Sequence, residues 1–274
     1  MTLTGRQVRD LLARHGARPT KTRGQNFVVD PNTVRRMARL AGVGPGDRVV
    51  EVGAGVGSLT LALAETGAAV TAVEVDPRLV PALRETVSGA GVTVVEADAM
   101  ALDWDGLLGG DEWAMVANLP YNIATPLVAD LLDHVPAVRR IVVMVQREVA
   151  ERLAAGPGEE AYGAVSVKVA YWATAKVVGR VPATVFWPEP KVESAIVDIR
   201  RHARPPGGAD RERMFALVAA GFGQRRKMLR RSLAGLVDDR GFEAAGVRPE
   251  ARAEELGLAH WERLAACSTS LPPS

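Results

Sequence analysis

The chain has 274 residues, 47% of them hydrophobic, and a formal net charge of only +2. That length is enough for one large domain, or for a large and a small one, around a sizeable buried core. The single cysteine, Cys267, excludes a disulfide framework, and the four histidines share no ligand spacing, so we predict no metal site.

Basic residues gather in two parts of the chain, the first two dozen positions and residues 200–231. Such clusters suggest a polyanionic partner, and for each cluster alone a solvated surface face is an equally good interpretation. The N-terminal residues lack the apolar core of a signal peptide, and the longest aliphatic run, 141–145, is too short to span a bilayer. We therefore expect a soluble cytoplasmic protein from a reducing compartment.

The first predicted helix follows this basic N-terminal arm, in the stretch DPNTVRRMARLAG. Asp30 suits its N-cap, Pro31 suits its first turn, and Gly42 ends it. Apolar residues recur between these positions at helical spacing, which predicts that one face packs on a core.

Short β-rich runs then alternate with helical runs, which is typical of a mostly parallel sheet with helices on both faces. The predicted strands are 48–53, 68–75, 92–98, 113–118 and 139–145. The predicted helices are 58–65, 77–88, 124–135 and 147–155.

The next runs, 164–181 and 194–201, resemble strands with no helix of normal length between them, so we predict an antiparallel edge on the sheet. Paired prolines and glycines in residues 201–210 indicate a linker. Beyond it the pattern is only helical, in 211–222, 225–237 and 259–268. We therefore predict an α/β domain over residues 1–204 and a small all-helical domain over 205–274.

A glycine-rich turn connects the first predicted strand of the sheet to the helix after it. Gly53, Gly55 and Gly57 have G-x-G-x-G spacing, so a ligand can lie against bare backbone, although a lone glycine loop is also typical of a flexible turn. Glu74 ends the second strand, where an acid can accept both ribose hydroxyls of a nucleoside. Asp98 ends the third, where a carboxylate can accept from an adenine amine.

These groups and Asn118 fall at the carboxyl ends of successive strands, the edge at which ligands bind an open α/β sheet. Each alone could be a solvated strand end, and their coincidence favours a nucleoside site. The short glycine loop has no basic residue nearby to hold phosphates, which favours S-adenosylmethionine over a dinucleotide such as NAD.

The stretch NLPY, residues 118–121, closes the fourth strand. The Asn118 amide oxygen and the Leu119 carbonyl can each accept one N–H of an adenine amine, which favours a tetrahedral nitrogen with its lone pair aimed at a methyl donor. Pro120 stiffens the chain at that carbonyl, and Tyr121 offers a ring for stacking worth roughly 1–3 kcal/mol. Catalysis would then rest on positioning. The alternative is a structural proline turn that packs a core tyrosine.

Phe186 is the second predicted stacking ring, because the two prolines in FWPEP stiffen the loop that carries it. Opposite Tyr121 it would enclose a base taken out of its stack. The alternative is that Phe186, Trp187 or both belong to the core.

With these motifs the chain resembles the KsgA family of ribosomal RNA adenine dimethyltransferases. The resemblance is carried by GQNFVVD (24–30), EVGAGVGSLT (51–60), Glu74, EAD (96–98), NLPY (118–121), QREVAERL (146–153), FWPEPKVES (186–194) and FGQRRKMLRRSL (222–233). The motifs run in the family's order over nearly the whole chain. Two departures, Val28 for the usual leucine and Ala54 for a common proline, leave the implied activity in place.

The resemblance implies a Rossmann-like methyltransferase fold and S-adenosylmethionine as cofactor. It implies dimethylation of two adjacent adenosines near the 3′ end of 16S rRNA in the 30S particle, as part of small-subunit biogenesis, and we expect a monomer. It implies cofactor contacts at Gln25, Asn26, Val28, Gly53, Gly55, Gly57, Glu74, Asp98, Ala99 and Asn118.

Two alternatives stay open. The Erm group dimethylates one adenosine of the large-subunit rRNA and shares the cofactor motifs. A non-catalytic RNA-binding assembly factor could keep the fold, but it would not need to keep Glu74, Asp98 and NLPY.

The segment FGQRRKMLRRSL resembles the KsgA form rather than the Erm form. As a helix it would pair Arg226 with Arg230 and Lys227 with Arg231 at i,i+4 spacing, which is mildly destabilising unless the charges face phosphate. The predicted RNA contacts are Arg225, Arg226, Lys227, Arg230 and Arg231.

Overall fold

In a computed structural model of the chain, the described residues are 2–20, 24–120, 122–204 and 210–268. The chain divides into two compact units, Met1–Ala150 with Ala175–Arg201, and Glu151–Thr174 with His202–Ser274. The predicted boundary after residue 204 places 151–174 in the first domain, whereas in the structure these residues pack with the C-terminal helices. That residue 204 separates two parts with different functions stays a prediction.

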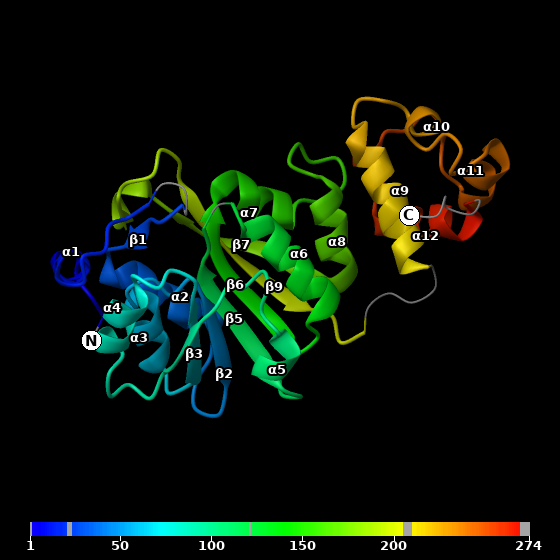
Figure 1. Cartoon of the computed structure of the whole chain (residues 1–274). Helices are drawn as coiled ribbons and strands as arrows, with labels where there is room; N and C mark the ends of the chain where they lie inside the picture. Colours follow the sequence, from blue (N-terminus) through cyan, green and yellow to red (C-terminus); the bar gives the residue numbers. More distant parts are fainter. Residues whose placement is uncertain (1, 21–23, 121, 205–209, 269–274) are drawn as a thin grey trace. The chain divides into compact units, whose positions relative to one another are not determined.

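The first unit is built on a seven-stranded sheet of order β4-β3-β2-β5-β6-β9-β7 (Figure 1). Its strands are β2 Arg48–Val52, β3 Ala69–Glu74, β4 Thr93–Glu96, β5 Trp113–Asn118, β6 Val138–Gln146, β7 Ala173–Val181 and β9 Ser194–Arg201. The pairs β4–β3, β3–β2, β2–β5 and β5–β6 are parallel, and β9 is antiparallel to β6. The predicted mostly parallel sheet with an antiparallel edge is confirmed.

Helices cover both faces of this sheet. Those that contact its strands include α2 Pro31–Ala41, α3 Ser58–Ala64, α4 Val80–Thr86 and α6 Ala124–His134. The chain also forms α5 Trp104–Leu108 and α7 Arg147–Ala154. Residues 49–52 of β2, 115–117 of β5 and 141–145 of β6 are buried without alternation, which requires a cover on each face.

The first predicted helix is confirmed as α2. The Asp30 side chain accepts hydrogen bonds from the main-chain N–H groups of Asn32 and Thr33, and Gly42 ends the helix in the left-handed region at φ 61°. Among the described residues no helix is both long enough and apolar enough to cross a bilayer.

The basic N-terminal arm forms a helix that the sequence did not predict, α1 Gly5–Arg14. Its residues Val8 and Leu12 are buried in one cluster with Phe27 and Leu79. Strand β1, Phe27–Val28, pairs antiparallel with β8, Phe186–Trp187, after a short 3-10 turn, η2 Ala183–Val185. The N-terminal segment therefore lies beside the FWPEP loop (Figure 1).

The second unit is helical. Its elements are α8 Ala164–Trp172, α9 Arg211–Gly223, α10 Leu229–Ser232, α11 Asp239–Ala245, η3 Ala253–Glu255 and α12 Leu258–Cys267. The prediction of a strand over residues 164–172 is wrong. Val167 and Tyr171, four residues apart, share one buried core with Met214 and Trp261, so packing on neighbouring helices prevails over the β-like alternation of AVSVKV.

The predicted helix over residues 225–237 is also wrong, since α10 covers only Leu229–Ser232. Before it the chain turns, with the main-chain N–H of Lys227 donating to the Gln224 carbonyl. The inferred helical i,i+4 pairing of like charges across this turn therefore does not occur.

Candidate functional site

A pocket opens at the carboxyl edge of the sheet, where β2 lies between β3 and β5. The chain leaves β2 toward β3 on one side and β5 lies on the other, so this is the topological switch point at which open α/β sheets bind ligands. The space within the pocket and its open mouth is about 950 Å³, part of which is open to solvent.

The pocket brings together most of the predicted cofactor residues. Those that line it are Gln25, Asn26, Val28, Gly53, Gly55, Glu74, Asp98, Ala99 and Asn118. Leu119 and Pro120 line it too. Gly57 does not: it stands before α3, where an added Cβ would lie 2.9 Å from Thr86 Cγ2.

The glycine turn is fixed by close neighbours on two sides. Gly55 has φ +60°, and an added Cβ would lie 3.1 Å from the Phe27 ring. A Cβ on Gly53 would lie 3.6 Å from Pro120 Cδ. The bare backbone of Gly55 therefore lets the turn contact the N-terminal segment, whereas a Cβ on Gly53 would make an ordinary contact with the NLPY stretch.

Glu74, 4% exposed, organises the turn through its carboxylate. Oε2 accepts the main-chain N–H of Gly55 at 2.7 Å, and Oε1 accepts that of Asp76 at 2.8 Å. Burial raises the pKa of Glu74, and these two hydrogen bonds oppose the rise. A carboxylate has about four acceptor sites, so Glu74 can still accept from a ribose.

Glu51 is a lining residue that the sequence analysis missed. It is 2% exposed, and its Oε2 has no hydrogen-bond partner in the part of the chain that the structure describes; the same holds for the hydroxyl of Ser58, which also lines the pocket. Burial raises the pKa of Glu51 to about 8, the Thr60 hydroxyl opposes that rise, and the charge of Glu74 adds to it. An acid inside an apolar strand, two residues before the glycine turn, was the available signal.

Asp98 lies beyond the end of β4 with an exposed side chain. Its Oδ1 accepts the main-chain N–H of Met100 at 2.9 Å, which turns the chain here and leaves the second carboxylate oxygen for other donors. Ala99, next to it, is buried.

Asn118, at the end of β5, contacts the N-terminal segment. Its Nδ2 donates to the main-chain carbonyl of Asn26 at 3.1 Å. The main-chain N–H of Leu119 donates to Met144, and the Pro120 carbonyl accepts from Ile123 and Ala124 at the start of α6. Within the described residues, no hydrogen bond reaches Asn118 Oδ1 or the Leu119 carbonyl. Tyr121 lies outside the described residues.

The Phe186 side chain is only 4% exposed and shares a core cluster with Val28 and Met144. Trp187, its neighbour, is half-buried against the cluster that contains Phe27. Stacking of Phe186 on a base would need its surroundings to open, and this role stays a prediction.

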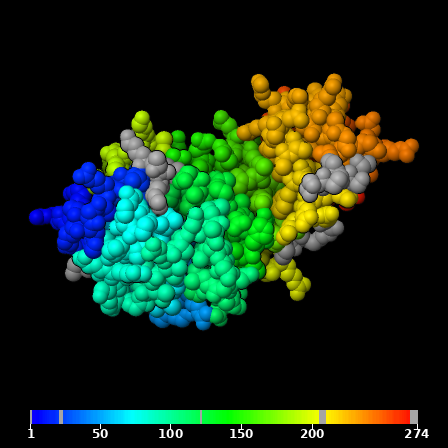
Figure 2. All heavy atoms as spheres, viewed as in Figure 1, coloured from blue at the N-terminus to red at the C-terminus, as the bar shows by residue number. Residues whose placement is uncertain are grey.

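The five predicted RNA contacts are all exposed. In Figure 2 the orange part of the chain, which contains the start of α10, presents its side chains at the surface. Arg225 pairs with Glu254 at 2.7 Å, and Arg230 with Glu250 at 3.4 Å. Arg226, Lys227 and Arg231 make no ion pair with the residues that the structure describes, so these three are the better phosphate candidates.

Comparison with known proteins places these features in context. The sequence model of the family Ribosomal RNA adenine dimethylase matches residues 17–269. The chain is 51% identical to "Ribosomal RNA small subunit methyltransferase A" of Kineococcus radiotolerans, an alignment that covers 96% of this chain and 91% of the relative. It is 50% identical to the protein of the same name from Thermobifida fusca, with 96% and 95% covered.

Solved structures show the same fold. The crystal structure of the 23S rRNA methyltransferase ErmE has a TM-score of 0.71 at 30% identity, covering 88% of this chain and 99% of that one. A dimethyladenosine transferase from Plasmodium falciparum has a TM-score of 0.72 at 22% identity, with 86% and 94% covered.

Proposed function

Because the chain belongs to the ribosomal RNA adenine dimethylase family, we propose that it dimethylates the N6 amines of two adjacent adenosines near the 3′ end of 16S rRNA. It is an S-adenosylmethionine-dependent rRNA methyltransferase with a Rossmann-like fold. One observation carries the choice of small-subunit RNA: the chain is far more similar to relatives named for the small subunit than to the 23S enzyme ErmE. We also propose that it acts as a monomer on the 30S particle, in small-subunit biogenesis.

The pocket fits the cofactor on its own chemistry. S-adenosylmethionine, when bound, supplies a methyl group already activated on a sulfonium. The buried Oε2 of Glu51, which has no partner among the residues that the structure describes, suits the α-ammonium of its methionine part. Glu74 would hold the ribose, and Asp98 the adenine amine. Val75 and Leu79 give the same pocket apolar walls.

Asn118 and Leu119 would hold the target base. Asn118 Oδ1 and the Leu119 carbonyl are two acceptors on adjacent residues that line the pocket, and an adenine amine has two N–H groups to give. Accepting both draws the nitrogen toward a tetrahedral geometry, in which its lone pair becomes available for attack. Acceptors that are fixed before the base arrives need no reorganisation during the reaction.

Transfer of labelled methyl groups tests this function. Under-methylated 30S particles, 50S particles and free rRNA are each incubated with the protein and labelled S-adenosylmethionine. We expect label on two adjacent adenosines of the 30S particle. Label on the 50S particle would indicate an Erm-like enzyme. RNA binding without any label would indicate an assembly factor.

A further inference from the structure

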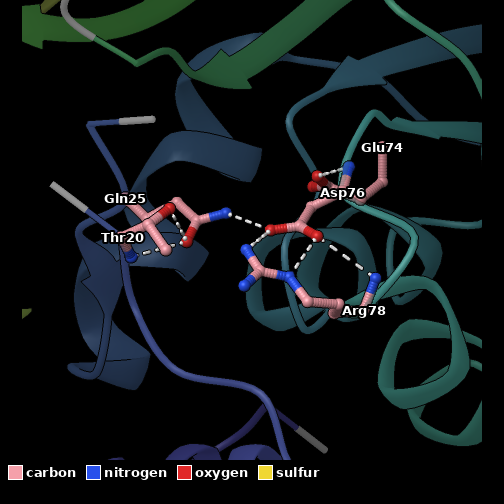
Figure 3. Close-up of polar contacts among 5 residues, drawn as sticks. All are labelled: Thr20, Gln25, Glu74, Asp76 and Arg78. Atoms are coloured by element: carbon pink, nitrogen blue, oxygen red, sulfur yellow. Dashed lines mark hydrogen bonds and ion pairs between the residues drawn. The ribbon is translucent and has the colours of Figure 1, made fainter. Parts of the chain in front are cut away.

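The side chain of Gln25 is engaged by the protein on two sides (Figure 3). Its Oε1 accepts from the main-chain N–H of Thr20 at 2.9 Å and from the Thr20 hydroxyl at 3.1 Å. Its Nε2 donates to Asp76 Oδ2 at 3.0 Å. Three of the four hydrogen bonds that a glutamine amide can form are therefore used within the chain, which leaves little capacity for a cofactor.

Asp76 is a firm anchor for this amide. It is 1% exposed, and Arg78 donates hydrogen bonds to its carboxylate from Nε at 2.9 Å and from Nη2 at 2.7 Å. The Arg78 hydrogen bonds and the Gln25 amide hold the pKa of Asp76 well below its usual range, against the effect of burial. Asp76 therefore stays ionised, and a hydrogen bond to an ionised carboxylate is among the strong ones.

The hydrogen bond between Gln25 and Asp76 links the predicted ribose site of the pocket to the predicted base site. On one side, the main-chain N–H of Asp76 donates to Glu74, the predicted ribose ligand, at 2.8 Å. On the other, Asn26 follows Gln25 directly, and its carbonyl receives the Asn118 amide at 3.1 Å. Gln25 thus stands between the residues that hold the cofactor and those that would hold the base.

We propose that Gln25 is a positioning residue: by joining Thr20 to Asp76 it holds the segment 24–28 in place, so that the Asn26 carbonyl orients Asn118 for methyl transfer. This differs from the expectation of a direct cofactor contact by its side chain, which stays a prediction, and it rests on the proposed function. In this proposal Asp76 and Arg78 also affect methyl transfer, because they hold Gln25 in place, although neither lines the pocket.

A double-mutant cycle tests the proposal. Gln25→Met keeps the length of the side chain and removes both kinds of hydrogen bond, and Asp76→Leu keeps a similar volume and removes the oxygen that accepts from Gln25. We expect each variant to lower the single-turnover rate on 30S particles about tenfold at saturating S-adenosylmethionine, the loss of one hydrogen bond to a charged group. The double variant should be no slower than the slower single variant, because both changes break the same link.

Hydrogen exchange supplies a readout that needs neither RNA nor turnover. The main-chain amides of residues 24–28 should exchange faster in Gln25→Met than in the parent, while the melting temperature changes little. Gln7→Met is the matched control, because Gln7 is exposed on α1 and, among the described residues, its side chain bonds only to Thr4. It should leave both the rate and the exchange of 24–28 unchanged.

Three results would overturn the proposal. Independent losses that multiply in the double variant would mean that Gln25 does not act through Asp76. A weaker cofactor affinity by calorimetry, with an unchanged rate at saturation, would make Gln25 a direct cofactor ligand. A lower melting temperature with an unchanged rate and unchanged exchange would make the contact merely structural. If the parent itself methylates no 30S particle, the proposed function fails, while the exchange experiment still decides whether Gln25 holds the segment.

Discussion

Asn118 donates from Nδ2 to the main-chain carbonyl of Asn26 over 3.1 Å, and this contact decides which way its amide points. A carbonyl oxygen only accepts, so the NH₂ group must face Asn26 and Oδ1 must face elsewhere. The N-terminal segment therefore selects the orientation in which Asn118 can accept from an adenine amine.

Changing Asn118 to aspartate should slow methylation although an acceptor is kept. Asn118→Asp would place a carboxylate oxygen against the Asn26 carbonyl, with no hydrogen between them, so the side chain should turn away. We expect a single-turnover rate about ten- to a hundredfold lower at saturating cofactor, from the loss of about 1.5–3 kcal/mol. Asn118→Ala should be at least as slow, with a smaller effect on RNA affinity. Parent-like turnover in Asn118→Ala would make NLPY a structural turn.

Glu74→Gln should weaken both the fold and cofactor binding. Its two oxygens accept the main-chain N–H groups of Gly55 and Asp76, and a glutamine amide has an acceptor for only one of them. One buried donor left unpaired costs about 1–3 kcal/mol, so urea unfolding should occur at a lower concentration. Calorimetry should show at least about a tenfold loss of S-adenosylmethionine affinity. Glu96→Gln, an exposed acid at the end of β4, is the control and should match the parent.

Glu51 should make the cofactor-free protein less stable as the pH rises. Its pKa is raised from 4.5 to about 8, so between these values the folded state holds a proton that the unfolded state has lost, and stability falls with increasing pH. The effect is a few kcal/mol at most, since one pKa unit corresponds to about 1.4 kcal/mol. Glu51→Gln should therefore unfold at higher urea than the parent at pH 9 and close to the parent at pH 5. If the stability of Glu51→Gln and that of the parent changed in parallel with pH, the raised pKa of Glu51 would be contradicted.

Arg226 and Lys227 should contact phosphate. Replacing both with alanine should flatten the salt dependence of rRNA binding by about one unit of slope for each lost contact, with cofactor affinity unchanged. Arg225→Ala is the informative contrast. Because Arg225 pairs with Glu254 and donates to the Glu160 carbonyl, this change should lower the free energy of unfolding and have little effect on the salt slope of rRNA binding. An unaltered slope in the double variant would make this turn an ordinary solvated surface.

The sequence by itself determined the parts of the fold whose physics is local. Asp30 and Gly42 bound α2 because a cap and a left-handed residue act within one turn of the helix. The glycine turn, Glu74 and Asn118 could be assigned to one edge because the carboxyl ends of parallel strands meet there whatever their order. Most of the residues predicted as cofactor contacts therefore line the pocket.

Only the tertiary structure decided what depends on partners distant in the chain. Residues 164–172 alternate like a strand and form α8, because Val167 and Tyr171 are buried against helices that follow some forty residues later or more. Gln25 stands in a cofactor motif, yet its amide binds Asp76, 51 positions away. Arg225 stands in a basic run, yet Glu254 neutralises it. A motif shows which groups are present, whereas hydrogen bonds and burial act over a few ångströms in space, and those neighbours exist only once the chain has folded.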